Sequence, residues 1–295
     1  MLEIDQEHLA IAAMQLRAEA SYRKTKEILA AKGIELLLLK GPHLGSTVYE
    51  HPGQRLYSDL DVLVRPKDFK AAVAALVEND FQPESFSHFS RKIQEDFKHW
   101  EFRSPYGWTI ELHRWLSGHD RFDIDVDALF DRAEPFLFGE TPALGLGHED
   151  LLLHLCLHMG TSYFKLIERK HVLDIALLVQ KRETDWPVFL VRVKQAGMRA
   201  IAYYSLKAAM EQDGARVPGS MLQELRPGRI RRAWLGRFLD TASFPIYRSP
   251  GDSWAKAKRM LLLPFIDGWG RRGRFAARMI THALKDVLKK SDSSQ

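Results

Sequence analysis

Two acidic residues interrupt an apolar stretch in the first quarter of the chain. The segment Ser58-Asp59-Leu60-Asp61-Val62-Leu63-Val64 has the composition of a buried strand, and residues two apart in a strand share one face. Asp59 and Asp61 therefore project together, while the intervening apolar side chains face the core. Adjacent carboxylates raise each other's pKa, and a divalent cation relieves this repulsion. The pattern predicts a metal site on one strand face, although such pairs also occur simply where a loop ends.

The residues just upstream have the features of a phosphate site. An apolar run over 34–39 has strand length, and Lys40-Gly41-Pro42 ends it. Proline suits the first turn of a helix, which we expect over about 43–50, ending at 51–53. The N-terminus of such a helix offers unpaired N–H groups and a positive dipole end, which attract phosphate. Lys40 and Arg55 add positive charge, so the sequence predicts a triphosphate beside a metal.

A third carboxylate comes from a later hairpin. Residues 108–115 alternate as a strand, which places Glu111 on one face with Thr109 and His113. Residues 97–103 form a second expected strand, and the segment between the two has turn composition. Pairing of this hairpin beside the aspartate strand would aim Glu111 at the aspartates. Alternatively, Glu111 is a solvated strand acid.

The rest of the chain is predicted to be mostly helical. We expect a helix over Leu9–Lys32, a crossover helix over Pro66–Asn79 and a linker over Gly139–Gly147. Further helices are expected over 148–159, 164–181, 186–196 and 200–212, followed by more broken helices to residue 290. The fold class is therefore α+β, with a small mixed β-sheet core followed by a mostly helical region. The expected domains are a catalytic domain with its N-terminal helix (1–138), a helical domain (148–215), a basic helical C-terminal region (216–290) and a disordered tail (291–295).

Charge and cysteine content limit the environment and the partners. Residues 226–290 carry sixteen Lys or Arg against four Asp or Glu, whereas the whole chain is only +5. A basic region of this kind favours a polyanionic partner, nucleic acid ahead of an anionic membrane, and the alternative is a solvated helical face. The single cysteine, Cys156, excludes an internal disulfide framework and fits a reducing cytoplasm. The chain begins without a signal-peptide pattern and contains no apolar run of membrane-spanning length, so we expect a cytoplasmic protein.

Two histidines on one expected helix have a spacing that zinc sites use. His154 and His158 lie four residues apart, with His171 nearby. The surrounding leucines, and the absence of a metalloprotease glutamate or a cysteine cluster, favour a structural role over zinc binding.

The order of these motifs resembles a known family. Leu39-Lys40-Gly41, then Arg55, then Ser58-Asp59-Leu60-Asp61, then Ile110-Glu111-Leu112-His113 are similar to the uncharacterised bacterial nucleotidyltransferase family of the DNA polymerase beta-like superfamily. The resemblance covers about residues 30–180. One departure is that Pro42 and His43 stand where the superfamily has a second small residue. A literal Gly45-Ser46 twelve residues before Asp59 is the alternative phosphate-binding turn, but it falls inside the expected helix.

This resemblance implies a reaction and a set of roles. The reaction is metal-dependent transfer of NMP from an NTP to an acceptor hydroxyl, with release of pyrophosphate and with two Mg²⁺ ions, Mn²⁺ being an alternative. The acceptor could be a small molecule, a peptide or an RNA end. The alternative is a catalytically inactive protein with the same fold that binds RNA or a protein partner. The implied metal-binding and catalytic residues are Asp59, Asp61 and Glu111, and the implied nucleotide-binding residues are Lys40, Gly41, Arg55, Ser58 and, from the helical part, Lys170.

Overall fold

The computed structural model describes residues 6–84, 99–117, 121–161, 169–240, 265–277 and 280. The chain forms two compact units, one of Met1–Gly118 with Ile124–Leu151, and one of His119–Asp123 with Leu152–Gln295. The finer division into segments ending at residues 138, 215 and 290 remains a prediction.

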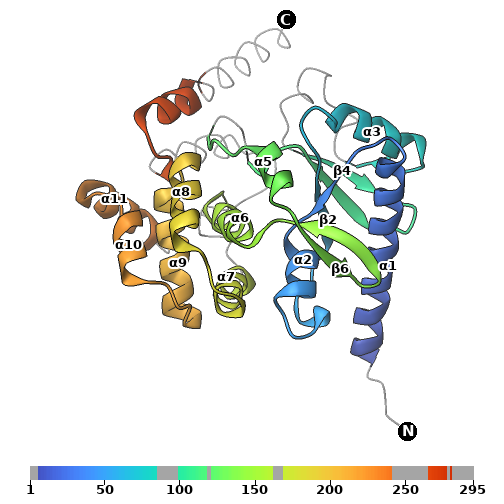
Figure 1. The fold of residues 1–295 in the computed structure, drawn as a ribbon, viewed down its shortest axis with the longest axis horizontal. Coiled ribbons are helices and arrows are strands. Elements are labelled where there is room, and N and C mark those ends of the chain that lie inside the picture. Colours follow the sequence, from blue (N-terminus) through green and yellow to red (C-terminus); the bar gives the residue numbers. More distant parts are fainter. Residues whose placement is uncertain are drawn as a thin grey trace, which may run out of the picture. The chain divides into compact units, whose positions relative to one another are not determined.

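A five-stranded mixed sheet is the centre of the first unit (Figure 1). The strand order is β1-β2-β5-β4-β3, in which β2 and β5 run parallel and all other neighbours run antiparallel. A small mixed sheet together with helices confirms the expected α+β class. The strands are β1 (Leu37–Leu38), β2 (Asp59–Leu63), β3 (Gln82–Pro83), β4 (His99–Arg103) and β5 (Thr109–His113).

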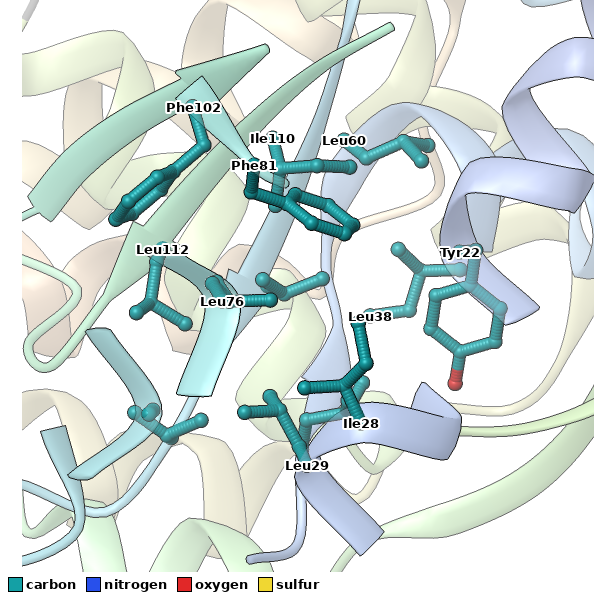
Figure 2. Packing of buried hydrophobic residues seen from close by; sticks show 14 of the residues in the cluster. Tyr22, Ile28, Leu29, Leu38, Leu60, Leu76, Phe81, Phe102, Ile110 and Leu112 are labelled. Carbon is teal, nitrogen blue, oxygen red and sulfur yellow. The ribbon is translucent and has the colours of Figure 1, made fainter. Parts of the chain in front are cut away.

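Two helices cover the apolar face of this sheet. α1 (Gln6–Ala30) packs against α3 (Phe69–Glu78) and β2, and their side chains form one core cluster with the sheet (Figure 2). Complete burial of a side chain such as Leu60 or Ile110 stabilises the fold by about 1.5–3 kcal/mol. The apolar half of the strand alternation thus fixes the register. The acidic half must then lie on the other face of the sheet.

The helix after β1 starts earlier than the sequence predicts. α2 spans Lys40–Thr47 rather than 43–50, because the chain changes from extended to helical geometry directly after Leu39. Pro42 still lies in the first turn, where its missing N–H costs nothing. The Lys40-Gly41 step therefore forms the start of α2. A short 3₁₀ helix, η1 (Pro52–Gln54), follows before β2.

The expected linker over 139–147 is wrong. After the short helix α5 (Val126–Asp131), strands β6 (Glu134–Phe138) and β7 (Thr141–Gly145) form a hairpin with Phe138 paired to Thr141. Gly139 at the turn has φ +60°, a conformation that short hairpin turns require. Glycine and proline content indicated a linker, but the alternating burial of residues 141–145 is that of a strand. β6 contacts α2 and β7 contacts β1, so the hairpin extends the first unit.

The second unit is helical over its described residues. α7 packs against α9, and α10 packs against both α8 and α9. The expected helices over 186–196 and 200–212 correspond to α8 and α9, whereas residues 164–168 of the helix expected over 164–181 lie outside the described ranges. None of the described helices combines the length and the apolar character needed to cross a bilayer. The helices are α6 (His148–Thr161), which begins in the first unit, then α7 (Arg169–Lys181), α8 (Trp186–Ala196), α9 (Arg199–Asp213), α10 (Gly219–Leu225) and α11 (Arg229–Asp240).

Some of the basic C-terminal charge is used within the second unit. Arg231 forms an ion pair with Asp267, and the same carboxylate accepts the backbone N–H of Arg199 at 2.7 Å. Arg271 Nε lies 2.7 Å from Asp123 Oδ2. These arginines hold the unit together. Residues 241–264, 278–279 and 281–290 of the basic region lie outside the described ranges, as does the tail expected over 291–295, and nucleic-acid binding stays a prediction.

Candidate active site

Pairing of two parallel strands brings the three predicted acids together. Asp61 of β2 lies opposite Glu111 of β5, and Asp59 lies opposite Thr109. Asp61 is buried, with 3% of its surface exposed, whereas Asp59 and Glu111 are half-buried. The alternation of each strand and the parallel register thus place all three carboxylates on the face away from the apolar core.

Lys40 neutralises one of these carboxylates. Its Nζ lies 2.7 Å from Asp61 Oδ1, and the side chain is 19% exposed. A backbone bond from Leu39 N–H to the Asp61 carbonyl, at 2.9 Å, holds the start of α2 beside β2. Lys40 has φ +47°, in the left-handed region that residues other than glycine rarely adopt. Such conformations cost energy and concentrate at functional sites, so this backbone supports a role for Lys40.

Two histidines complete the cluster. His113 Nε2 lies 2.8 Å from Asp61 Oδ1 and 3.2 Å from Glu111 Oε2, and the side chain is only 3% exposed. His99, opposite His113 in β4, has its Nε2 3.9 Å from the same Glu111 oxygen and 3.4 Å from Glu101 Oε1. Nitrogen donors therefore face the acids from two adjacent strands.

The electrostatics of the three acids differ. Burial and the neighbouring carboxylates of Asp61 and Glu111 raise the pKa of Asp59 to about 6. Burial would also raise the pKa of Asp61, but the Lys40 ammonium and the hydrogen bond from His113 outweigh it and hold that pKa well below its usual range. Burial acts on Glu111 in the same direction, and the His113 hydrogen bond reverses it, so the pKa of Glu111 is lowered. Asp59 is thus the acid whose charge is least compensated.

Contact with Asp61 also fixes the charge of Lys40. Burial alone would lower the pKa of the ammonium group, but the attraction and hydrogen bond of Asp61 overcome it, and the pKa is raised. Lys40 therefore carries a full positive charge at neutral pH. Three carboxylates surround this one lysine, so the cluster keeps an excess of negative charge that a cation would neutralise.

Gly41 has a packing reason as well as the predicted phosphate role. A Cβ atom on Gly41 would lie 2.7 Å from Tyr57 Cβ, closer than real side chains approach. The start of α2 therefore passes Tyr57, two residues before β2, at a distance that only glycine permits. The alternative turn, Gly45-Ser46, lies within the last turn of α2, away from the helix N-terminus that offers N–H groups.

The other predicted nucleotide-binding residues occupy different places. Arg55 is buried, and its Nη1 donates to the Leu56 carbonyl at 2.7 Å. Ser58 is exposed directly before β2. Lys170 lies in α7 of the second unit, half-buried, and its role stays a prediction. The second unit also contains a cavity of about 420 Å³ near Arg182, Thr184 and Arg216, which includes none of the predicted site residues.

Sequence reasoning missed His99 and His113 as members of the site. The period-two alternation that selects Glu111 also places His113 on its face, and the same alternation along β4 pairs His99 with Glu101. The signal was therefore present in the strand pattern. What the pattern lacked was the β4–β5 register, which sets His99 opposite His113.

Solved structures that match the chain are remote in sequence. The lincosamide antibiotic adenylyltransferase LnuA, bound to lincomycin, is 13% identical, with 56% of this chain and 98% of that one covered and a TM-score of 0.37. The antibiotic-resistance factor ANT(2'')-Ia is 10% identical over 65% and 94% of the two chains, with a TM-score of 0.40. An antigenic nucleotidyltransferase-like protein from Paracoccidioides brasiliensis is 15% identical over 71% and 91%, with a TM-score of 0.41.

A family model provides the assignment. No curated protein matches the chain. The model described as "Uncharacterised nucleotidyltransferase" matches residues 2–211, which include the whole carboxylate cluster and α2. The resemblance seen in the motifs is thereby confirmed, and the chain belongs to this family of uncharacterised nucleotidyltransferases.

Proposed function

We propose that the protein transfers an NMP group from an NTP to an acceptor hydroxyl, with Asp59, Asp61 and Glu111 as the catalytic acids. The observation that carries the proposal is the parallel β2–β5 register, which sets Asp61 directly opposite Glu111 while α2 begins beside them. Family membership supports the same class of reaction. The base of the NTP and the identity of the acceptor are open, with small molecules, peptides and RNA ends all compatible with a hydroxyl acceptor.

The carboxylate cluster fits the divalent cations that this chemistry uses. Three acids face one lysine, and burial together with the carboxylates of Asp61 and Glu111 raises the pKa of Asp59 more than Lys40 and His113 lower it. Carboxylate oxygens are the preferred ligands of Mg²⁺. When bound by Asp59, Asp61 and Glu111, Mg²⁺ or Mn²⁺ would neutralise phosphate charge and acidify the acceptor hydroxyl.

The protein's own groups have separate tasks in the proposed reaction. The N–H groups at the start of α2 and the ammonium of Lys40 bind the triphosphate, with Arg55 and Ser58 as further proposed contacts. The acceptor oxygen forms a bond to the α-phosphorus while the α–β phosphoanhydride bond breaks, and pyrophosphate leaves. Glu111 accepts the proton that the acceptor hydroxyl loses. Lys170 is proposed to lend a further cation to the leaving phosphates.

Labelled substrates test the proposal directly. Purified protein is incubated with each α-labelled NTP, Mg²⁺ and fractions of a cell extract, and the fraction that takes the label is identified. We expect label transfer and pyrophosphate release with the wild-type protein, and neither with Asp61→Asn. Equal transfer by the variant would contradict the assignment of the site. NTP binding without pyrophosphate release in any fraction would instead favour the inactive binding protein.

A further inference from the structure

The histidines beside Glu111 give this site a donor set that carboxylates alone do not. His113 Nε2, His99 Nε2 and a Glu111 oxygen all lie within 4.8 Å of one another, and the two rings are 4.8 Å apart between centroids. His113 Nε2 also lies 2.8 Å from Asp61 Oδ1. Two nitrogen donors and two carboxylates thus converge on one point between β2, β5 and β4.

The spacing of these atoms is close to that of ligands sharing one cation. Nitrogen and oxygen ligands at about 2.1 Å from a tetrahedral ion are about 3.4 Å apart. The separations here are 3.2 Å for His113 with Glu111 and 3.9 Å for His99 with Glu111. Rotation of the half-buried His99 ring would bring the longer separation into range. The 2.8 Å between His113 Nε2 and Asp61 Oδ1 is a hydrogen-bond distance, and it would lengthen when an ion replaces the shared proton.

Hydrogen bonding alone leaves this cluster incompletely satisfied. His113 Nε2 faces two carboxylates, but a single N–H can donate fully to only one of them. Nδ1 of His113 is buried without a hydrogen-bond partner among the described residues, so no protein group there fixes the tautomer. A cation at the convergence point would accept lone pairs from Nε2 and from both carboxylates at once.

We infer that His99, Glu111 and His113, with Asp61 beside them, hold a first-row transition-metal ion of the class that imidazole prefers, such as Zn²⁺ or Co²⁺. Imidazole nitrogen favours these ions, whereas Mg²⁺ favours oxygen donors and keeps several waters. The inference deepens the proposed function, on which its catalytic meaning rests. The ion nearest the acceptor would then differ in kind from the Mg²⁺ that accompanies the NTP.

Cobalt is the probe, because its visible absorption and its effect on proton NMR both report the ligands. The full chain, stripped of metal, is titrated with Co²⁺ in the absence of any NTP. We expect two far-shifted proton signals that disappear in D₂O, one from the Nδ1–H of each bound imidazole. A stoichiometric amount of Zn²⁺ should remove both signals, and a large excess of Mg²⁺ should remove neither.

Two variants locate the ion. His99→Gln should leave one shifted exchangeable signal and weaken Co²⁺ binding at least about tenfold. His158→Gln is the matched control, because His158 meets the ring of His171 edge to face in the second unit, with ring centroids 4.8 Å apart, and the two form a competing imidazole pair. This control should keep both signals. His113→Gln, checked for folding by circular dichroism, should also lose a signal.

Several results would overturn the inference: no shifted exchangeable signal with wild-type protein, an unchanged spectrum in His99→Gln, or loss of both signals in His158→Gln. Should His113→Gln fail to fold, His99→Gln and its control still decide the question. Because the titration contains no NTP, it is independent of turnover. Label transfer without cobalt signals would overturn this inference alone, and cobalt signals without label transfer would overturn the proposed function alone.

Discussion

Two buried aspartates in the same unit are neutralised in different ways. Asp150 in α6 is 2% exposed, and Arg132 binds it through two hydrogen bonds of 2.8 and 3.1 Å. Asp61 in β2 is 3% exposed and contacts Lys40 and His113. The planar guanidinium of Arg132 donates one hydrogen bond to each Asp150 oxygen, which is the usual geometry of a structural ion pair. Asp61 shares a single lysine with two other acids.

The difference separates a structural pair from the proposed binding site. A matched pair completes its own charge balance and needs nothing further from solution. The cluster around Asp61 has surplus negative charge and a lysine with a strained backbone, features that stabilise neither the strand nor the helix on their own. Fixed surplus negative charge favours a cation, and a bound cation would in turn attract the anionic triphosphate. The two aspartates should therefore respond in opposite ways to the same substitution.

The largest expected effect is the loss of activity in Asp61→Asn. The amide keeps the shape of the side chain but cannot supply the charge that binds a cation, so NMP transfer should fall by about 10³-fold or more. Stability should fall less than activity does, because the carboxylates of Asp59 and Glu111 still offset the charge of Lys40. Label transfer and thermal unfolding of the same preparation measure both quantities. A variant that unfolds but retains activity per folded molecule would make Asp61 a structural residue like Asp150.

Asp150→Asn should show the reverse pattern. Loss of the carboxylate leaves the Arg132 guanidinium with one neutral acceptor, which should cost about 2–3 kcal/mol of unfolding free energy in urea denaturation. The 38% exposure of the Arg132 side chain keeps the cost below that of a fully buried pair. Asp123→Asn is the control, since Asp123 is 50% exposed in its pair with Arg271 and should cost less than about 1 kcal/mol. Equal costs for the two variants would contradict the role assigned to burial.

The strand faces could be predicted from sequence, whereas several contacts could not. Period-two alternation correctly placed Asp59 with Asp61 and Glu111 with His113, because one apolar face must be buried. The Arg132–Asp150 pair depends on how α6 packs near β6, which no local pattern encodes. Glycine and proline in the local composition indicate a linker over 139–147, and only pairing with β6 makes residues 141–145 a strand.

The start of α2 shows the same limit at the site itself. The stop signal Gly41-Pro42 predicted a helix from residue 43, yet the helix begins at Lys40. Lys40 adopts its unusual φ where the Leu39 N–H bonds to the Asp61 carbonyl and the ammonium pairs with the Asp61 carboxylate. These contacts join residues more than twenty positions apart. Tertiary contacts, rather than local helix propensity, place the Lys40 ammonium beside the acids.

Two glycines at helix starts differ in how closely other atoms approach them. Gly41→Ala would place a methyl group against Tyr57 Cβ, and we expect a loss of about 1–3 kcal/mol in thermal or urea unfolding. Gly219→Ala in α10 is the matched control, because a Cβ there meets nothing within 4 Å and should be neutral or slightly stabilising. A fully stable Gly41→Ala with impaired NTP binding would show that Gly41 serves phosphate rather than packing.

The smallest expected effect is a pH-dependent gain of stability in Asp59→Asn. The pKa of Asp59 is about 6 in the folded protein and 3.8 as the reference value, so the folded state binds a proton more tightly than the unfolded chain. Protonation of Asp59 therefore stabilises the folded wild-type protein fully below about pH 4, and this stabilisation is lost as the pH rises through about 6. In metal-free buffer at pH 8, Asp59→Asn should be more stable than wild type by about 1 kcal/mol, discounted from the full shift because the side chain is only partly buried.

At pH 4 the advantage of Asp59→Asn should vanish, because the wild-type carboxyl is then protonated as well. Unfolding of both proteins across this pH range, with Asp68→Asn as the control, measures the difference; Asp68 makes no side-chain cap bond to α3. The gain at pH 8 should also disappear when a divalent cation is added, since the cation relieves the same repulsion in the wild-type protein. A gain that persists with the cation would mean that Asp59 faces away from the bound ion. The cluster would then hold its metal through Asp61 and Glu111.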